Sequence, residues 1–561
     1  MLKNIPAFFA DFFEHDDKVS SNKNIRTYLF GVVLLMLCGW KVYNGLQGVM
    51  DIQFADESAY MRFGLDMFGK FNKDWGPMYC IWYKCLSWIT TDTIQLYYLN
   101  YALTSVLIGV LLYIFLLRIS VAPMLALLVS FSILVSDLNI AVWPRISHFC
   151  IALLLFFLII ITYIRQLTYK FLVFALFCLI ASYARPEFYI SFLLAIIAAF
   201  ISFLYNRNNF SSKDYLRFLS FFILFAALHY IFRFPSNDFF GYNRGVAAFY
   251  QHYAFNYKVR THANIDSWLY WEEICKQQFG DCNSMWCVIK TQPLIVLSNT
   301  LFNIKNYFLS TLLNSYTYIF PVHLFQGKKI QLGIMLLLTV FISYLIFRKK
   351  SRSGFLQQAT KLKFYLFILL LFIAPTILSC VVVFPREHYV YLQMPFFLLV
   401  LICLLQPVLE QFSFKPIIVA SFGLLLFLST PNIKNYSFLK VNNDTPLLCN
   451  KELVKYLEKK YADKPHTLFT NMPFVRGMLP LNFHEINTIF DKKKRIPFRH
   501  YMDSAQIDIV VLTPSTFRDP HILSDSTWTD FIQNYGQYHF RREQFNDCET
   551  YLLVKEDEER L

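Results

Sequence analysis

The sequence predicts a polytopic α-helical membrane protein with a small α/β domain at its C-terminal end. Its 561 residues are 56% hydrophobic and 16% charged, with a mean hydropathy of +0.40, so the chain is too apolar for a soluble globular protein. Apolar runs of roughly 18 or more residues recur, and each is long enough to cross a bilayer core of about 30 Å. The density of charged residues rises sharply after residue 430, where the α/β domain is expected to begin.

About eleven segments are expected to span the membrane, with an uncertainty of about two because short apolar runs also form interfacial helices. The first span follows a polar N-terminal segment and lacks a small-residue cleavage site, so we expect an anchor rather than a signal peptide. The predicted spans are residues 28–46, 94–117, 121–142, 149–164, 171–183, 188–205, 216–232, 330–347, 364–384, 389–405 and 416–428.

The positive charges in the short loops indicate the orientation of these spans. With a cytoplasmic N-terminus, the densest basic loops, at residues 165–170, 207–217 and 348–363, all lie in the cytoplasm, as the positive-inside rule requires. Topology thus accounts for most of the formal net charge of +14, and no nucleic-acid partner is expected. The predicted domains are a cytoplasmic segment at 1–27, a transmembrane module at 28–430 with outer loops at 47–93 and 235–329, and an extracytoplasmic domain at 431–561.

Two outer segments have a predicted structure of their own. The apolar piece at residues 307–325 is expected to be an interfacial or re-entrant helix, because a further span there would place the basic loop 348–363 outside. In the tail, residues 507–512 and 551–554 have the apolar, β-branched composition of strands, and residues 451–460 are typical of an amphipathic helix.

The twelve cysteines are compatible with this layout. Several lie inside predicted spans, where a thiol behaves as a small apolar group. In an oxidising compartment Cys449 and Cys548 form the one disulfide pairing available within the tail. Cys275, Cys282 and Cys287 lack a CxxC pair, so a disulfide or free thiols are favoured there over a zinc site, and no metal ligands are assigned.

An acid pair, Asp56-Glu57, directly follows the first predicted span. A solvated loop is the ordinary explanation for two adjacent acids. At a membrane surface, however, such a carboxylate could also serve as a catalytic base that deprotonates or orients an acceptor hydroxyl.

Three turns between apolar runs carry an arginine on the predicted outer face. Arg145 lies in one of them, and the other two have the sequences Arg185-Pro186-Glu187 and Arg386-Glu387-His388. Interfacial arginines that snorkel to water are the ordinary explanation for each turn alone. Because arginine presents a planar fork of donors that matches phosphate, three such turns on the face of the acid pair favour a lipid-phosphate ligand.

At these residues the sequence resembles the GT-C superfamily of polytopic glycosyltransferases, which includes the protein O-mannosyltransferases and the lipid A aminoarabinose transferases. The resemblance covers the architecture of the whole chain, including the outer C-terminal domain, but its specific motifs are short. The matching pieces are Asp56-Glu57 with Tyr60, Gly76-Pro77-Met78-Tyr79, Arg185-Pro186-Glu187, and Arg386-Glu387-His388-Tyr389 with Pro395.

The resemblance implies an enzyme that moves a sugar from a polyprenyl-phosphate donor to a glycan, lipid or protein acceptor, in the inner membrane of a bacterium. Asp56 is implied as the general base and Glu57 as a residue that orients Asp56 or the acceptor; in some relatives a neighbouring acid binds a divalent metal, so a metal cofactor stays open. The arginines are implied to neutralise the departing phosphate. The implied substrate-binding residues are Tyr60, Arg145, Arg185, Glu187, Arg386 and His388.

Two other classes stay open. A polysaccharide ligase or polymerase of the O-antigen type also uses arginines against lipid-linked phosphate, but it needs no acid pair after the first span. A transporter or flippase of lipid-linked glycans performs no chemistry, and transporters commonly show repeated halves with broken helices at mid-membrane. The sequence shows no internal repeat, and its charges gather at one face, which favours the glycosyltransferase.

Overall fold

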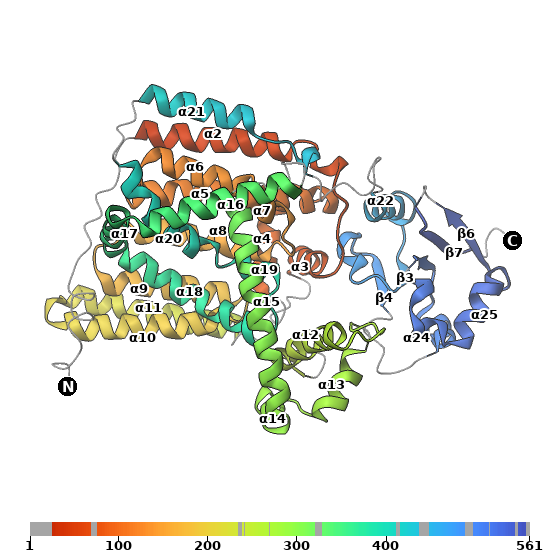
Figure 1. Cartoon of the computed structure of the whole chain (residues 1–561). Coiled ribbons are helices and arrows are strands. Elements are labelled where there is room, and N and C mark those ends of the chain that lie inside the picture. The colour runs from red at the N-terminus through yellow and green to blue at the C-terminus, as the bar shows by residue number, and fades with distance from the viewer. Residues whose placement is uncertain are drawn as a thin grey trace. The chain divides into compact units, whose positions relative to one another are not determined.

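The computed structural model describes residues 25–68, 76–233, 238–239, 242–268, 270–319, 328–410, 416–436, 448–487, 497–514, 516–544 and 548–556 (Figure 1). These residues fold into two compact units. The first unit is helical and comprises residues 25–44, 76–78 and 102–435. The second comprises residues 45–68, 79–101 and 436–556. Most of the predicted N-terminal segment, residues 1–24, lies outside the described residues.

The described residues form apolar helices at all eleven predicted positions, and nearly all of these residues belong to the first unit. Among the described residues, five helices are long and apolar enough to cross a membrane, and six shorter apolar helices occupy the other positions. The chain therefore has the helices of a polytopic membrane protein, while the number that cross the bilayer stays a prediction. The apolar helices are α2 (Ile25–Tyr43), α5 (Thr93–Arg118), α6 (Pro123–Leu134), α8 (Ile146–Ile161), α9 (Leu167–Ser182), α10 (Phe188–Asn206), α11 (Ser212–Phe232), α16 (Lys328–Phe347), α18 (Lys363–Val382), α20 (Met394–Leu409) and α21 (Pro416–Ser429).

Two predicted spans are not continuous helices. The segment 121–142 divides into α6 and the short α7 (Asp137–Ala141), because the Ser136 side chain accepts a hydrogen bond from the Asn139 N–H and starts a new helix. The segment 389–405 likewise divides into α19 (Glu387–Tyr391) and α20. In the first case one polar side chain within an apolar run, that of Ser136, caps a new helix.

The predicted interfacial helix at 307–325 is part of a longer element. It belongs to α15 (Pro293–Ile319), a helix of 27 residues, while residues 320–325 lie outside the described part of the chain. This helix is not one of the five that meet the criteria of length and apolar composition for a membrane span.

Helices α2 and α21 pack closely because a glycine lies between them. A Cβ added at Gly423 would lie 2.7 Å from the Phe30 ring. At the end of α21 the Lys41 ammonium donates to the carbonyl oxygens of Phe427 and Leu428, at 2.9 and 3.0 Å. A cation at a helix C-terminus satisfies carbonyls that have no partner within the helix.

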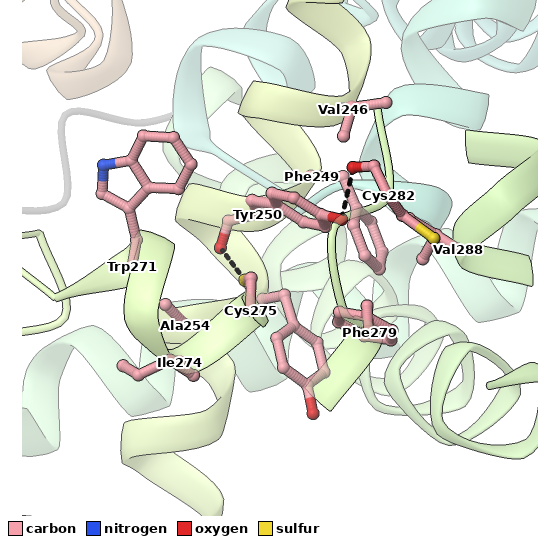
Figure 2. Packing of buried hydrophobic residues seen from close by; sticks show 11 residues of the cluster. Val246, Phe249, Tyr250, Ala254, Trp271, Ile274, Cys275, Phe279, Cys282 and Val288 are labelled. Atoms are coloured by element: carbon pink, nitrogen blue, oxygen red, sulfur yellow. Dashed lines mark hydrogen bonds between the residues drawn. The ribbon is translucent and has the colours of Figure 1, made fainter. Parts of the chain in front are cut away.

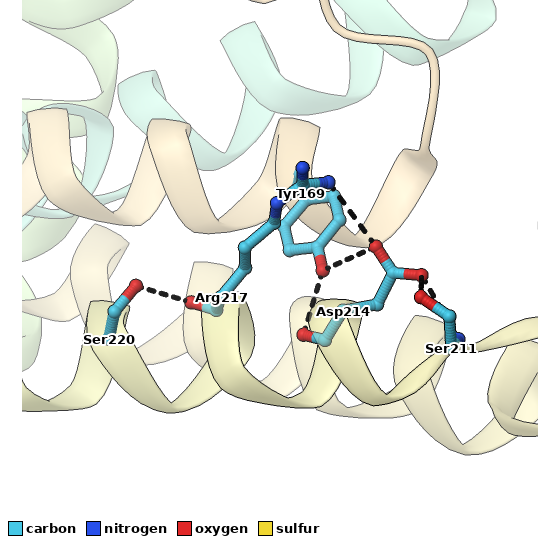
Figure 3. Close-up of polar contacts among 5 residues, drawn as sticks. All are labelled: Tyr169, Ser211, Asp214, Arg217 and Ser220. Atoms are coloured by element: carbon cyan, nitrogen blue, oxygen red, sulfur yellow. Dashed lines mark hydrogen bonds and ion pairs between the residues drawn. The ribbon is translucent and has the colours of Figure 1, made fainter.

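The start of α11 is capped by its own side chains, as Figure 3 shows. Ser211 and Asp214 form a capping box, in which the Ser211 N–H donates to the Asp214 carboxylate at 3.0 Å. The Tyr169 hydroxyl, from α9, donates to the Asp214 carbonyl oxygen at 2.8 Å. These contacts connect α9 to α11 beside the loop that carries the predicted cytoplasmic charges.

The segment after α11, predicted to be an outer loop, contains a small helical core of its own (Figure 2). It consists of α12 (Arg244–Thr261), α13 (Trp271–Phe279) and α14 (Met285–Thr291). The Tyr250 hydroxyl donates to the Cys282 carbonyl at 2.8 Å, and Cys282 forms a disulfide with Cys287. Cys275 is a buried free thiol that contacts the Tyr250 carbonyl at 3.4 Å. The three cysteines thus divide into one disulfide and one thiol.

The second unit contains a five-stranded mixed sheet with the order β4-β3-β5-β7-β6. Strands β3 (His466–Thr470), β4 (Phe483–Asn487) and β5 (Ile509–Leu512) are parallel, whereas β7 (Tyr551–Lys555) runs antiparallel to β5 and to β6 (Phe540–Gln544). The two predicted strands, the helix α22 (Cys449–Tyr461) and the Cys449–Cys548 disulfide are confirmed. The remaining helices are α23 (Phe498–Ala505), α24 (Pro520–Leu523) and α25 (Ser526–Asn534).

The loop that carries the acid pair, predicted to lie on the outer side, folds with this sheet domain. Its helix α3 (Asp56–Leu65) and most of α4 (Pro77–Leu86) belong to the second unit, although the predicted division assigned residues 47–93 to the membrane module. The Asp51 carboxylate accepts hydrogen bonds from the backbone N–H groups of Asn450 and Lys451, both at 2.9 Å, and so caps α22. Arg62 donates to the Leu479 carbonyl at 3.1 Å.

Candidate functional site

The acid pair begins helix α3 directly after a strained residue. Ala55 has a φ of 81° and a ψ of −126°, a conformation that glycine adopts readily and alanine does not. Its N–H donates to the Pro473 carbonyl at 2.9 Å, and its carbonyl accepts from the Ser58 hydroxyl at 3.0 Å. Such strain costs about 1–3 kcal/mol and persists only where the surroundings hold it, often beside functional groups.

A close backbone contact secures α3 from the other side. A Cβ added at Gly477, in the 3-10 helix η7 (Val475–Met478), would lie 2.2 Å from the Ser58 carbonyl oxygen. Only glycine permits this approach. The tail therefore holds the first turn of α3 in one position, which is the kind of rigid support that a catalytic residue needs.

Glu57 lies at the centre of a buried hydrogen-bond network. Its side chain is 1% exposed, and its Oε1 accepts from the hydroxyls of Tyr79 and Tyr83, both at 2.5 Å, and from Nδ2 of Asn100 at 3.1 Å. Burial and the adjacent Glu57 carboxylate raise the pKa of both tyrosines, so their hydroxyls stay protonated and donate. Glu57 therefore connects α3, α4 and the start of α5.

Asp56 has a different environment from its neighbour. It is half-buried and is the first residue of α3, where the positive end of the helix dipole stabilises a carboxylate. Tyr60, one turn later, is only 4% exposed and packs with its ring centroid 5.2 Å from that of Tyr79. Of the residues predicted in this loop, Asp56 is thus the most exposed, while Glu57 and Tyr60 are buried beside it.

Arg185, one of the predicted arginines in the first unit, is already paired within the protein. Arg185 is buried and its Nε donates to the Glu187 carboxylate at 2.6 Å, while Nη1 donates to the Ser147 hydroxyl at 3.0 Å. Its guanidinium also lies 4.6 Å from the centroid of the Tyr389 ring. Much of its charge is therefore already compensated within the protein.

Arg386 lies close to His252, His388 and the exposed Trp268. Its guanidinium is 5.4 Å from the Trp268 ring centroid, and the arginine itself is half-buried. Burial, together with the charges of Arg185 and Arg386, holds the pKa of His388 well below its usual range, so this imidazole is neutral. We call Arg185, Arg386, His388 and His252 the arginine cluster.

His252 is a member of this cluster that the sequence did not suggest. Nδ1 donates to the Ala248 carbonyl at 2.5 Å, and burial and the charge of Arg386 lower the pKa of His252 to about 3. Within the described residues its buried Nε2 has no hydrogen-bond partner. A neutral imidazole with Nδ1 protonated carries a lone pair on Nε2, which can accept a hydrogen bond. His252 lies more than a hundred positions from Arg386, and no sequence pattern connects them.

Arg145 contributes to the core of the first unit. It is 1% exposed, and Nη1 donates to the carbonyls of Asn139 and Val142 at 2.9 and 3.2 Å, while Nη2 bonds the Ser105 hydroxyl. The Asn139 carboxamide in turn accepts from the Tyr391 hydroxyl at 2.8 Å. These contacts make Arg145 a link between α5, α7 and α19 rather than a group that presents donors to a ligand.

The tyrosines around Glu57 could have been partly inferred. Tyr79 and Tyr83 are four residues apart, so they lie on one face of a helix and can reach the same group. As to metals, the described residues contain no group of three histidine, cysteine or acidic side chains that could hold an ion.

No protein-family model matches the chain, and no curated protein matches it. The resemblance to GT-C glycosyltransferases therefore depends on the motifs and the order of elements alone.

Proposed function

We propose that this protein is a membrane glycosyltransferase of the GT-C type, which moves a sugar from a polyprenyl-phosphate donor to an acceptor at the outer face. The observation that carries the proposal is the start of α3, where a strained Ala55 presents the half-buried Asp56 next to a fully buried Glu57. A solvated loop needs neither the strain nor the buried network. A preorganised base requires rigid support, which the backbone contacts of Ala55 and the network around Glu57 can supply.

In the proposed reaction Asp56 takes the proton of the acceptor hydroxyl or amine. The acceptor oxygen or nitrogen forms a bond to the anomeric carbon of the sugar, while the bond between that carbon and the lipid phosphate oxygen breaks. The phosphate leaves with the bonding electron pair. Such general-base assistance typically contributes about 10²–10⁴-fold to the rate.

The arginine cluster is the proposed site for the phosphate. Arg386 is assigned the larger part, because Arg185 is already paired with Glu187 at 2.6 Å and Arg386 is the more exposed of the two. A departing phosphate gains negative charge in the transition state, and a fixed guanidinium stabilises that charge. The free Nε2 of the neutral His252 could accept a hydrogen bond from a hydroxyl of the donor.

The first test compares two aspartates of one helix. Asp56→Asn is expected to lower sugar transfer by about 10²–10⁴-fold without loss of folded protein, because asparagine keeps the size of the side chain but cannot take a proton. Asp66→Asn is the matched control, since Asp66 is also half-buried and caps the other end of α3. The assay follows release of polyprenyl phosphate from a panel of polyprenyl-phosphate sugars. Near-normal transfer by Asp56→Asn would remove the central residue and favour a ligase or a transporter.

The second arm tests the phosphate site. Arg386→Ala is expected to weaken donor use roughly tenfold to more than a hundredfold, the usual cost of about 1.5–3 kcal/mol for one charge-assisted contact. Arg260→Ala is the control, because Arg260 also lies over an aromatic ring, 5.8 Å from the Tyr253 centroid, in the same unit. Arg185→Ala is expected to combine weaker donor use with lower stability, because it leaves Glu187 without its partner. Unchanged donor use in both cluster variants would contradict the site.

A further inference from the structure

An apolar cavity of about 670 Å³ lies in the first unit, among α15, α16, α20 and the basic helix α17 (Lys349–Lys361). Its wall consists of aliphatic and aromatic side chains such as Leu312, Ile342, Phe355 and Leu401, with two hydroxyls. Among the lining side chains that the structure describes, Arg352 is the charged one. The cavity involves none of the residues assigned above to sugar transfer.

Two of the helices that line the cavity, α17 and α20, pack closely against each other. A Cβ added at Gly354 would lie 2.6 Å from the Cβ of Pro407, which shows that α17 and α20 touch without an intervening side chain. Ser351 and Gln358 of α17 are each 5% exposed and face the same way. Leu356, which lines the cavity, is 59% exposed.

Such an apolar cavity is unfavourable both when it is hydrated and when it is empty. Apolar cavities do not hold water well, because water there finds no hydrogen-bond partners. An empty cavity also loses the dispersion contacts of its lining atoms. In a chain with membrane helices, the apolar group present at high concentration around the protein is the acyl chain of a lipid.

The positive charge of α17 favours a lipid with an anionic headgroup. Its sequence Lys349–Lys361 contains four basic residues and no acid, and Arg348 and Lys363 flank it. Basic clusters next to membrane helices attract anionic lipids, and arginine binds phosphate with two parallel donors. The predicted orientation also places α17 at the cytoplasmic leaflet, which is the anionic one.

We propose that this cavity binds one acyl chain of an anionic glycerophospholipid, whose phosphate contacts Arg352. The site is separate from the proposed catalytic residues. The lipid fills the space between α16, α17 and α20 and so stabilises their packing.

The test uses the full-length protein purified in detergent and incubated with phosphatidylglycerol or phosphatidylcholine, each at the same concentration. Native mass spectrometry counts the lipids retained, and the thermal midpoint measures stabilisation. We expect one phosphatidylglycerol to be retained in preference to phosphatidylcholine and to raise the midpoint. Arg352→Gln is expected to reduce this preference by about tenfold or more. Lys350→Gln, which removes a charge from the same helix but does not line the cavity, should change it much less.

A second variant tests the cavity rather than the charge. Leu401→Trp fills the space and should abolish retention while Arg352 is kept; Ser343→Leu serves the same purpose if the larger residue prevents folding. Equal retention of the two lipids, equal effects of Arg352→Gln and Lys350→Gln, or undiminished retention in the filled variants would each overturn the proposal. Because the readouts are lipid retention and stability, they are independent of whether the protein transfers sugars.

Discussion

The buried network around Glu57 allows a quantitative prediction about stability. Oε1 of Glu57 accepts three hydrogen bonds, and Nδ2 of Asn100 also lies 2.8 and 2.9 Å from the hydroxyl oxygens of Tyr79 and Tyr83. Glu57→Ala removes this common acceptor, so the buried hydroxyls of Tyr79 and Tyr83 and the Asn100 amide each lose a hydrogen bond to it. An unsatisfied buried donor costs about 1–3 kcal/mol, so the variant is expected to lose about 3–6 kcal/mol after partial relaxation.

Smaller changes to the same network should have graded effects. Tyr79→Phe removes one bond to a charged acceptor and is expected to cost about 1.5–3 kcal/mol. Glu57→Gln keeps an acceptor but loses the charge, and the lower cost of burying a neutral amide offsets part of that loss, so we expect about 1–3 kcal/mol. Because the donors share one acceptor, Tyr79→Phe and Tyr83→Phe should not be additive.

The assay is the thermal midpoint of the purified full-length protein at a fixed scan rate, since large membrane proteins commonly unfold irreversibly. Tyr230→Phe is the control, because that tyrosine is 88% exposed and its hydroxyl should contribute little. A Glu57→Ala midpoint equal to that of Tyr230→Phe would refute the structural role of Glu57. Asp56→Asn should show the reverse pattern, with activity lost and the midpoint nearly unchanged.

Two further predictions concern the tail and the topology. Burial would raise the pKa of Glu543, but hydrogen bonds from Lys460, Tyr461 and Tyr456 lower it to about 2, so this carboxylate stabilises the fold above about pH 4.5 and loses that effect as the pH falls toward 2. The difference in thermal midpoint between wild type and Glu543→Gln should therefore shrink from pH 7 to pH 3; a constant difference would contradict this account. For the topology, cysteines engineered at the exposed positions Gln357 and Lys459 should react with an impermeant reagent only from the cytoplasmic and only from the outer side, respectively. Reaction of both from one side would mean that the number of spans is wrong by an odd number, with α15 as the helix to reconsider.

Local sequence was enough for the positions of the apolar helices and for part of the tail. Hydropathy is a property of a short segment, so the runs at 94–117 and 188–205 could be recognised without knowing their neighbours. The same holds for the strand β5 and for the central residues of β7, which are apolar because both faces of the sheet are buried there. Cys449 and Cys548 were the only two cysteines in the tail, which left one pairing.

The different environments of the two adjacent acids depended on tertiary structure. Successive residues of a helix point about 100° apart, so either Asp56 or Glu57 could have met the tyrosines of α4. Which one does so depends on how α3 is held by Pro473 and Gly477, which lie more than 400 residues later in the chain. The sequence offers no sign of such a contact.

The same reason applies to the arginines. Arg145, Arg185 and Arg386 lie in similar turns between apolar runs, yet one is buried among carbonyls, one is paired with Glu187 and one lies over Trp268. A charged side chain is accessible or not according to the groups that pack around it, and these come from distant segments. The apolar pattern therefore specifies where helices form, whereas packing between helices decides which of their polar residues can meet a substrate.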